Sequence, residues 1–525
     1  MRRRHLLSAA SLAAASPRIA RSQNARLLRF IPQSDPTGLD PVQTTMAVAL
    51  VHGYMIFDTL YGRDAQGLMQ PQMVEGHVVE ADGLRWTLTL REGLRFHDGT
   101  PVLARDCVQS IRRWGQRDVF GSALMAVLDE LSAPDDRRIV FRLRRPFPLL
   151  PEALGKNATT MLPIMPERLA LTDSARQVPE MVGSGPFRFL ANERVVGSHA
   201  AYARFEGYVP RQDPPSALAG AKIAHFDRVE WKIISDPATA ANALQAGEVD
   251  WVDGVLNDLE PRMRRNRNLT LAYAEDASLA VLRFNHLHPP FDNPAIRRAL
   301  LGAVDQRSFM TACAGGNPQA WRDGVGAFLK GAPMANDVGI EVLTGPRDLD
   351  KVRRDLAAAG YRGEKVVVLN AADFPVISAM TEVGADMMRS VGMNVDLQSL
   401  DWGTTLQRRA KREPVEQGGW SVFCTGLTGT NTFDPAGHLG LRGNGTAPGS
   451  WFGWPTSPRL EELRDAWLAT ADESSRLALG RDIQAALWQD VPFLPLGQYL
   501  RLGAWRRELQ GMSPTMPLFF NLRWS

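Results

Sequence analysis

Two periodicities alternate along this chain, and together they restrict the folds open to it. Apolar and polar residues alternate with a period of two in 84–90, 139–143 and 229–233, which is the pattern of a strand with one buried face. Segments with helix start signals and helically spaced apolar residues follow later in the chain. This alternation predicts α/β or α+β lobes rather than an all-helical or all-strand protein.

The helices are predicted mainly from their caps. Asp236 and Pro237 suit the N-cap and first position of a helix, and Gly247 suits its C-terminal cap. Asn293 and Ser457, each followed by proline, open two further helices, and apolar residues at helical spacing in 296–304 and 479–487 each form a single buried face. A short strand is expected at 249–252.

Length and composition predict a large, well-packed protein. A chain of 525 residues corresponds to about three domains or two large lobes. Hydrophobic residues make up 44% of the chain and charged residues 22%, which allows a packed core and excludes wholesale disorder. No internal repeat with a period of 20–50 residues is found.

Residues 1–22 have the pattern of an export signal. The pair Arg3-Arg4 precedes a short, weakly apolar stretch, as in a twin-arginine signal, and a cut after Ser22 would release the chain from residue 23. The alternative is a basic N-terminus on a cytoplasmic protein. No cysteine lies near the signal, so we expect no lipid anchor, and no later stretch has the ~18 apolar residues of a membrane span.

The charge of the chain is concentrated in that signal. The formal net charge is +3, and the first 22 residues hold five arginines and no acid, so their removal leaves about −2. A nearly neutral protein has no electrostatic footprint for nucleic acid or for an anionic membrane. The three cysteines, Cys107, Cys313 and Cys424, are far apart and predict buried small hydrophobic residues rather than a disulfide framework.

Sequence motifs for common catalytic and cofactor sites are absent. The chain has no phosphate-binding G-x-x-x-x-G-K-[ST], no complete G-x-G-x-x-G, no H-E-x-x-H and no G-x-S-x-G. His97-Asp98 precedes glycine, and Asp-Gly after a strand predicts a turn rather than an acid/base pair. His286 and His288 would share one face of a strand as candidate nickel or copper ligands, with ordinary surface histidines as the alternative.

A series of sequence blocks resembles one family. The stretch Leu90-Arg91-Glu92-Gly93-Leu94-Arg95-Phe96-His97-Asp98-Gly99-Thr100-Pro101-Val102 is similar to the signature block of the extracytoplasmic solute-binding proteins of family 5. These proteins serve ABC importers for dipeptides, oligopeptides and nickel. Further blocks follow in the family's order, including Gly183-Ser184-Gly185-Pro186-Phe187 and Asp434-Pro435, so the resemblance covers about residues 27–510.

The resemblance implies a two-lobed α/β periplasmic-binding-protein fold of the large class, with a hinge between the lobes. It assigns 23–280 and 485–525 to lobe I, with an extra subdomain at about 64–185, and 281–484 to lobe II. It also implies a monomer in the periplasm that binds a small peptide-like solute and delivers it to a membrane permease and ATPase complex. Neither catalysis nor a cofactor is expected of such a protein.

Candidate ligand-binding residues come from two segments and from the tryptophans. In the resembled family, peptide binders place an aspartate four residues before the Pro of Asp434-Pro435 to pair the ligand's amine, and here that position is Asn431. An amide cannot supply the full charge, and charge-assisted bonds are roughly twice as strong as neutral ones. A solvated loop and ordinary core tryptophans are the alternatives. The predicted contacts are Gln43, Thr44, Thr45, Met46, Trp402, Trp420, Thr425, Asn431, Phe433 and Asp434.

Two other functions stay open at this stage. One is a nickel- or metal-chelate-binding protein of the same fold, with His286 or His288 as ligands. The other is an exported hydrolase, because a catalytic triad assembles from residues distant in sequence and leaves no local motif.

Overall fold

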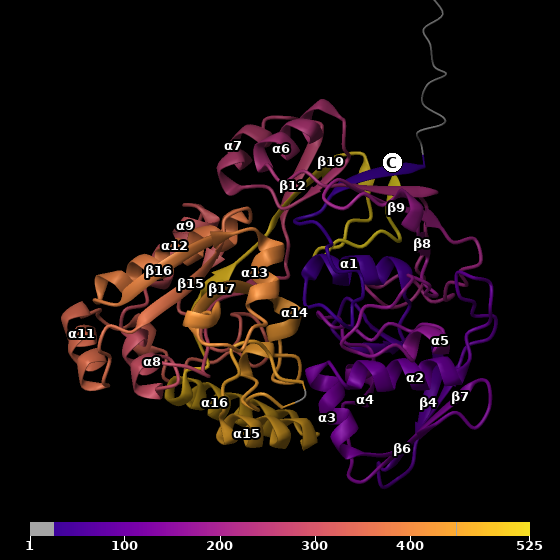
Figure 1. The fold of residues 1–525 in the computed structure, drawn as a ribbon. Coiled ribbons are helices and arrows are strands. Elements are labelled where there is room, and N and C mark those ends of the chain that lie inside the picture. The colour runs from indigo at the N-terminus through magenta and orange to yellow at the C-terminus, as the bar shows by residue number, and fades with distance from the viewer. Residues whose placement is uncertain (1–25, 448) are drawn as a thin grey trace, which may run out of the picture.

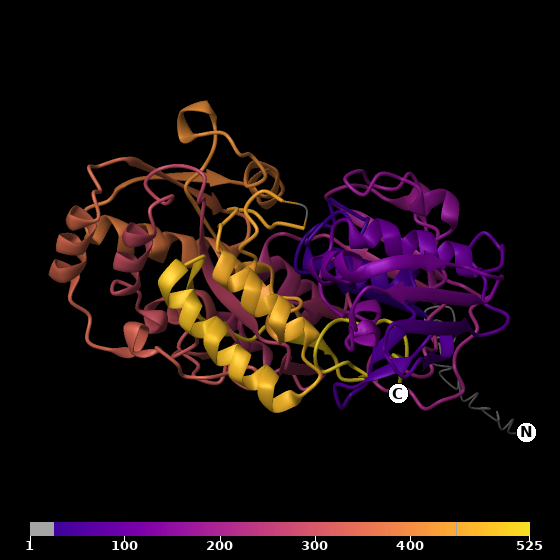
Figure 2. The same cartoon turned by 90° about the horizontal axis from the view of Figure 1, so that it is seen from below.

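The computed structural model describes residues 26–447 and 449–525, and the expected export signal lies outside them. Two lobes lie side by side in Figure 1, the first drawn mainly in indigo and magenta and the second mainly in orange. Figure 2 shows the same division from below, with two long helices near the C-terminus running along the second lobe.

A seven-stranded mixed sheet forms the centre of the first lobe. Its central strand pairs in parallel with both neighbours, and the remaining pairs are antiparallel. Phe30 of that central strand packs against Trp231, Trp251 and Phe519 in the core on one face of the sheet, while Ile31 belongs to a second buried cluster on the other face. The order is β12 (Leu269–Tyr273), β19 (Leu502–Arg506), β11 (Trp251–Asp253), β1 (Leu27–Ile31), β10 (Arg228–Lys232), β9 (His199–Arg204) and β8 (Phe187–Phe189).

A six-stranded sheet forms the centre of the second lobe. Its middle strand β13 is antiparallel to both neighbours, while β15 pairs in parallel with β16 and β17. The order is β14 (Trp321–Arg322), β18 (Phe493–Tyr499), β13 (Ser278–Phe284), β17 (Val422–Thr428), β15 (Lys365–Ala371) and β16 (Asn394–Leu400).

A separate four-stranded antiparallel sheet lies within the range expected for an extra subdomain of the first lobe. Its strands are β4 (Val74–Val79), β5 (Arg85–Leu90), β7 (Arg138–Leu143) and β6 (Leu128–Ser132). Two short hairpins pair β2 (Tyr61–Arg63) with β3 (Met69–Pro71) and β20 (Leu509–Gln510) with β21 (Arg523–Trp524).

The α-helices of the described residues divide between the two lobes. Those of the first lobe are α1 (Ala47–Ile56), α2 (Ala104–Gly115), α3 (Val119–Val127), α4 (Leu150–Leu154), α5 (Glu167–Ala170), α6 (Pro237–Ala246) and α7 (Glu260–Met263). Those of the second are α8 (Pro294–Leu301), α9 (Gln306–Ala314), α10 (Glu341–Thr344), α11 (Leu349–Ala358), α12 (Pro375–Ser390), α13 (Trp402–Arg408), α14 (Gly429–Thr432), α15 (Pro458–Ala469) and α16 (Glu473–Asp490). None of the helices described here is long and apolar enough to cross a membrane.

The chain passes between the two sheets twice, at neighbouring places. The first crossing is 274–277, between β12 and β13, and the second is 500–501, between β18 and β19. Because β12 pairs with β19 and β13 with β18, the two crossings continue one antiparallel ribbon. The two crossings differ from the lobe boundaries expected from the sequence. Residue 281, the expected start of lobe II, lies inside β13. The chain returns to the first sheet at 500–501 rather than at 485, because β18 belongs to the second sheet.

Local signals in the sequence correspond to the observed caps. The Asp236 side chain accepts a hydrogen bond from the Thr239 amide at the start of α6, and Gly247 ends the helix with a φ of 77°. Asn293 caps α8 in the same way, but that helix ends at Leu301, so Ala303 and Val304 lie beyond it. The Asp98–Gly99 pair forms the predicted turn, with Gly99 at a φ of 86°, and Cys107, Cys313 and Cys424 are buried and free.

Candidate functional site

A crevice between the lobes consists of three connected chambers. The hinge chamber, of about 380 Å³, lies beside the crossings; the inner chamber, of about 90 Å³, comes next; and the outer chamber, of about 880 Å³, lies beyond it. The hinge and inner chambers share Gln33, Trp402 and Tyr499, and the inner and outer chambers share Thr45 and Arg409. The crevice is thus lined by residues of both lobes along its whole length.

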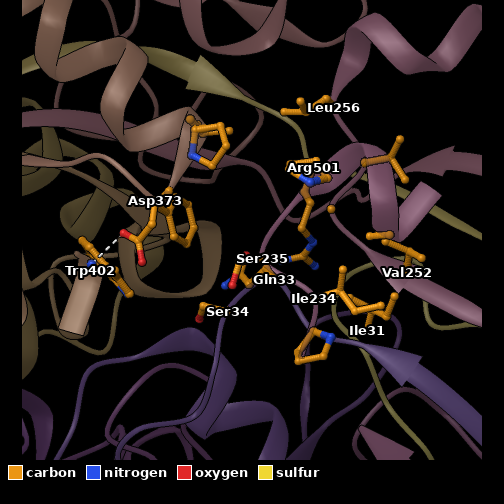
Figure 3. Close-up of a pocket in the computed structure, with 18 of the residues that line it drawn as sticks. Ile31, Gln33, Ser34, Ile234, Ser235, Val252, Leu256, Asp373, Trp402 and Arg501 are labelled. Carbon is orange, nitrogen blue, oxygen red and sulfur yellow. Dashed lines mark hydrogen bonds between the residues drawn. The ribbon is translucent and has the colours of Figure 1, made fainter. Parts of the chain in front are cut away.

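The hinge chamber is built from the ends of strands. Figure 3 shows Gln33 and Ser34, which follow β1, between Asp373 and Trp402 of the second lobe on one side and Arg501 on the other. The Trp402 backbone amide donates to Asp373 Oδ1 at 2.7 Å, which fixes the start of α13. The ring of Phe374 packs against that of Trp402 with centroids 5.4 Å apart, so the second lobe presents an aromatic wall.

Arg501 of the second crossing is neutralised within the protein. Its Nε lies 2.7 Å from Oδ1 of Asp253, a carboxylate whose pKa is raised by burial and lowered by Arg501. This pair fixes the hinge side of the crevice, and the described residues that line the hinge chamber include no other arginine or lysine.

In the inner chamber, a side chain of the second lobe joins the first lobe directly. The Asn431 amide nitrogen lies 3.0 Å from Thr159 Oγ1 and 2.8 Å from Thr428 Oγ1, and its amide oxygen lies 3.1 Å from Thr159 Oγ1. Asn431 and Thr159 are both buried. The Asn431 amide is therefore occupied by protein partners in this closed arrangement, and it connects the lobes.

Arg409, just after α13, is a buried cation without a carboxylate partner among the described residues. Only 6% of the residue is exposed, and burial lowers its pKa to about 9. One terminal nitrogen donates to Thr45 Oγ1 of the first lobe at 3.0 Å, while Nε has no partner in the described part of the chain. The guanidinium also lies 4.5 Å from the ring centroid of Phe452. An unpaired buried guanidinium that lines two chambers is suited to bind an anionic group.

A second arginine positions the wall behind Arg409. Arg283 of β13 is fully buried, and its Nε donates to the Phe452 carbonyl at 2.8 Å while Nη1 donates to the carbonyls of Gly440 and Pro492. Its guanidinium lies 4.8 Å from the ring centroid of Trp451, a wall of both the inner and outer chambers. Arg283 thereby holds the loop that carries these aromatic side chains.

Seven of the ten residues predicted from sequence line the crevice. Gln43 and Thr44 line the outer chamber, and Thr45 and Met46 line both the outer and inner chambers. The remaining three are Trp402, which lines the hinge and inner chambers, and Thr425 and Asn431, which line the inner chamber.

Three predicted residues lie elsewhere. Trp420 is 1% exposed and packs against Phe423 and Trp454 in the core. Phe433 lines a separate cavity, where the Arg63 guanidinium lies 5.2 Å from its ring centroid. Asp434 accepts hydrogen bonds from the amides two and three residues later, so its carboxylate stabilises a turn. The glycine-rich segment before it is partly strand β17 and partly helix α14, which is why the expected loop does not aim these side chains at the crevice.

The crevice also contains residues that the sequence analysis did not select, chiefly Arg409, Gln33, Phe374, Tyr499 and Arg501. Arg409 stands in the segment 408–413, which is arginine, lysine and glutamate apart from one alanine and resembles a solvated helix end. Its burial depends on Thr45, which is 364 positions away in sequence. No local signal distinguishes such a residue from a surface cation.

The two candidate metal ligands point to different partners. His286 Nε2 donates to the Pro492 carbonyl at 3.2 Å, and His288 Nε2 donates to the Arg412 carbonyl at 2.7 Å. Within residues 26–447 and 449–525, no group of three or more histidine, cysteine, aspartate or glutamate side chains is placed to hold a metal ion.

Comparisons with known proteins agree on one family. Residues 69–448 match the model of the bacterial extracellular solute-binding proteins, family 5. The probable peptide ABC transporter periplasmic-binding protein y4tO of Sinorhizobium fredii is 38% identical over 92% of this chain and 91% of its own. The glutathione-binding protein GsiB of Pectobacterium atrosepticum is 24% identical over 90% of this chain and 89% of its own.

Solved structures share the fold at low sequence identity. The periplasmic binding protein AgaA of A. tumefaciens R10, in complex with agropinic acid, superposes with a TM-score of 0.80 at 19% identity, covering 95% of this chain and 99% of its own. The protein DppA of Helicobacter pylori, in complex with the peptide STSA, has a TM-score of 0.79 at 20% identity, covering 95% and 98%. The fold is that of the periplasmic binding proteins.

Proposed function

We propose a ligand class and a mode of capture for this chain, which belongs to the bacterial extracellular solute-binding proteins of family 5. It is the substrate-binding component of an ABC importer, and the members of its family are binding proteins of transporters rather than enzymes. The proposed ligand is a small, peptide-like solute that carries an acidic group, enclosed between the lobes and delivered to the membrane permease.

The observation that carries this proposal is the unpaired guanidinium of Arg409. A buried charge is costly to keep away from water unless an opposite charge meets it. Arg409 lines the crevice, and within the described residues its side chain has only a hydroxyl of the first lobe as hydrogen-bond partner, so a carboxylate of the solute would complete its charge-assisted hydrogen bonds. Two proteins of similar structure are compatible with an acidic ligand, because one was solved in complex with agropinic acid and the other with mannopinic acid.

Asn431 has a different role in this proposal. In this arrangement its amide is shared between Thr159 and Thr428, so it does not pair with an amine of the ligand. We infer instead that it favours the closed form, since its contact with Thr159 exists only while the lobes meet. The acidic group, rather than the amine, is then the anchor of the solute.

Capture follows from the two-lobed geometry. A ligand shifts the balance between open and closed forms only by binding the closed form better. A carboxylate at Arg409 is placed to do so, because Thr45 of the first lobe approaches the same guanidinium. We infer that the cargo leaves unchanged, and that the protein acts as an exported, unanchored monomer in the periplasm, where its named relatives work.

The test uses Ala-Ala-Ala and its C-terminal amide, which differ by the carboxylate alone. Calorimetry on the wild type is expected to give about 100-fold weaker binding of the amide, because truncating one partner of a buried charged pair costs about 2–5 kcal/mol. Arg409→Gln should weaken the acid to the level of the amide, Arg409→Lys should recover part of the difference, and Arg481→Gln, an exposed arginine on α16, should change neither peptide.

Two results would contradict the proposal in different ways. If acid and amide bind the wild type equally, Arg409 is not the anchor of a carboxylate. If neither binds, and native mass spectrometry of freshly purified protein shows a bound solute without an acidic group, the ligand class is wrong. Scattering with and without the tripeptide tests closure, which should make the molecule more compact.

A further inference from the structure

The outer chamber is unusual in the charge of its walls. Three arginines line it, Arg117, Arg409 and Arg412, and none of the described residues that line it is an aspartate or a glutamate. Its other polar walls are neutral, including Gln43, Gln116 and Gln177 of the first lobe. A chamber of about 880 Å³ is large enough for a small ligand.

Arg117 is the arginine of the first lobe that lines this chamber. It lies in the turn between α2 and α3, and its guanidinium makes no hydrogen bond or ion pair within the part of the chain that the structure describes. Burial lowers its pKa, as does Arg113, while Asp173 and Asp40 act in the opposite direction. Asp40 is already paired with Arg113, with 2.7 Å between Oδ2 and Nη2, so it neutralises Arg117 only from a distance.

Arg412 brings a second charge from the other lobe. Its guanidinium lies 5.4 Å from the ring centroid of Trp454, and it too has no carboxylate partner among the described residues. Arg409 stands three residues earlier, at the boundary between the outer and inner chambers. Arg117 and Arg412 are both exposed, and Arg409 is buried, so cations of both lobes line one chamber that has no acidic side chain among its described lining residues.

We propose that the outer chamber binds a second acidic group of the solute, bridged by Arg117 of the first lobe and Arg412 of the second. The cargo class is then a compact molecule with at least two acidic groups, one at Arg409 and one in the outer chamber. This inference rests on the proposed function, because it takes the assignment of the first acidic group to Arg409 as given.

An acidic group in the outer chamber would also stabilise the closed form of the protein. Cations on opposite lobes repel each other, and they do so more strongly as the lobes approach and water leaves. An anionic group between them replaces that repulsion by two attractions, which exist together only in the closed form. A solute with a single acidic group would satisfy Arg409 but leave the cations of the outer chamber without a counter-charge.

The test compares tripeptides that differ by one charge at nearly constant shape. Three pairs hold either Glu or Gln at the first, second or third position, with alanine elsewhere. In the wild type, the best-placed Glu peptide is expected to bind at least about tenfold more tightly than its Gln partner. In Arg117→Gln/Arg412→Gln this ratio should fall to about one, and the Gln peptide should bind no more weakly than it binds the wild type, because the repulsion between the two cations is removed as well. Arg481→Gln should keep the full ratio.

The outcomes separate the two proposals. If the Gln peptides bind and no Glu peptide binds more tightly, the second acidic site is overturned and the role of Arg409 stands. If no tripeptide binds at all, the peptide-like class of the proposed function fails, and citrate is then the probe that decides on the chamber. Citrate should raise the midpoint of thermal unfolding of the wild type and of Arg481→Gln but not of the double variant; an equal shift in all three, or none, overturns the site.

Discussion

The two lobes treat their buried cations differently. In the first lobe, buried cations are paired with buried carboxylates: Arg113 with Asp40, Lys222 with Asp58, and Lys156 with Asp118. In the second lobe, Arg283, Arg297 and Arg409 have no carboxylate partner within the described residues; the first two donate to backbone carbonyls, and Arg283 and Arg409 lie against aromatic rings. Arg442 and Arg464 of that lobe share the single acid Glu461.

This difference distinguishes cations that are neutralised within the protein from cations that remain able to bind a ligand. An ion pair closed within one lobe is neutral and offers nothing to a ligand. Cations held by carbonyl dipoles keep their full charge, and they leave the interior of the second lobe positive beside the crevice. Arg283 and Arg297 use this charge to hold loops, whereas Arg409 presents it to the inner and outer chambers.

The largest change in the free energy of unfolding is expected from breaking a buried ion pair of the first lobe. Asp40 is fully buried and accepts hydrogen bonds from two nitrogens of Arg113 and from the Val42 and Val178 amides. Asp40→Asn leaves the Arg113 charge buried without compensation, so the free energy of unfolding should fall by about 3–5 kcal/mol. Urea denaturation at neutral pH measures this.

The matched control removes both charges of that pair. In Asp40→Asn/Arg113→Met no charge is left uncompensated, so much of the lost stability should return. A single variant that is destabilised by less than about 1 kcal/mol would show that the carbonyls of Thr172 and Arg176, which also accept from Arg113, suffice to hold the cation. The first lobe would then not differ from the second.

The next effect concerns acid sensitivity in the second lobe. His438 is fully buried, its Nε2 donates to the Ala327 carbonyl at 2.8 Å, and its Nδ1 has no partner in the described part of the chain. Burial, together with the positive charges of Arg464 and Arg283, lowers its pKa to about 3, although the hydrogen bond to the Ala327 carbonyl acts in the opposite direction. As the pH falls, the His438 ring is therefore protonated in the unfolded chain before it is protonated in the folded protein. The free energy of unfolding decreases as the pH falls below about 6.5, the pKa of the unfolded chain.

Between pH 7 and pH 5, His438 should lower the free energy of unfolding by about 2 kcal/mol, since each pH unit below the pKa of the unfolded chain is worth about 1.36 kcal/mol. His438→Gln should make the pH dependence of urea denaturation shallower by this amount, whatever its effect at neutral pH. An unaltered slope in His438→Gln would mean that the ring is not held neutral.

The smallest effect is expected for the stability of the ligand-free Arg409→Gln variant. No carboxylate is left without a partner by this change, and the cost of burying the charge disappears, so the free energy of unfolding should change by no more than about 1 kcal/mol. Denaturation of protein freed of ligand measures this. A loss of more than about 2 kcal/mol would place Arg409 with Arg283 and Arg297, as a cation that holds the structure.

The fold was more predictable than the site, and particular residues show why. Asp236, Pro237 and Gly247 act within one helix, so their neighbours in sequence are also their partners in space. Gln43 to Met46 and Asn431 could be predicted near the crevice because they stand beside motifs that resemble those of a family. Arg409 could not be predicted, because its burial depends on contact with the first lobe and its unpaired charge on the lack of a carboxylate partner among the described residues.

The predicted residues that lie outside the crevice have a similar explanation. Trp420 and Asp434 belong to the recognised segment, but the strand β17 begins only at Val422, and Asp434 turns its carboxylate toward its own backbone. A motif specifies the path of the chain through a region. It does not specify which side chains along that path face the ligand.

The double crossing between the lobes has a consequence for the membrane partner. Tyr273 stands opposite Leu502 on one side of it, and Ser278 opposite Tyr499 on the other, so the ribbon is hydrogen-bonded on both flanks. Such a ribbon twists and bends far more readily than it stretches or shears. The relative movement of the lobes is thereby reduced to a rotation, and a permease that contacts both lobes can recognise a loaded molecule by a single angle, whatever the chemistry of the cargo inside.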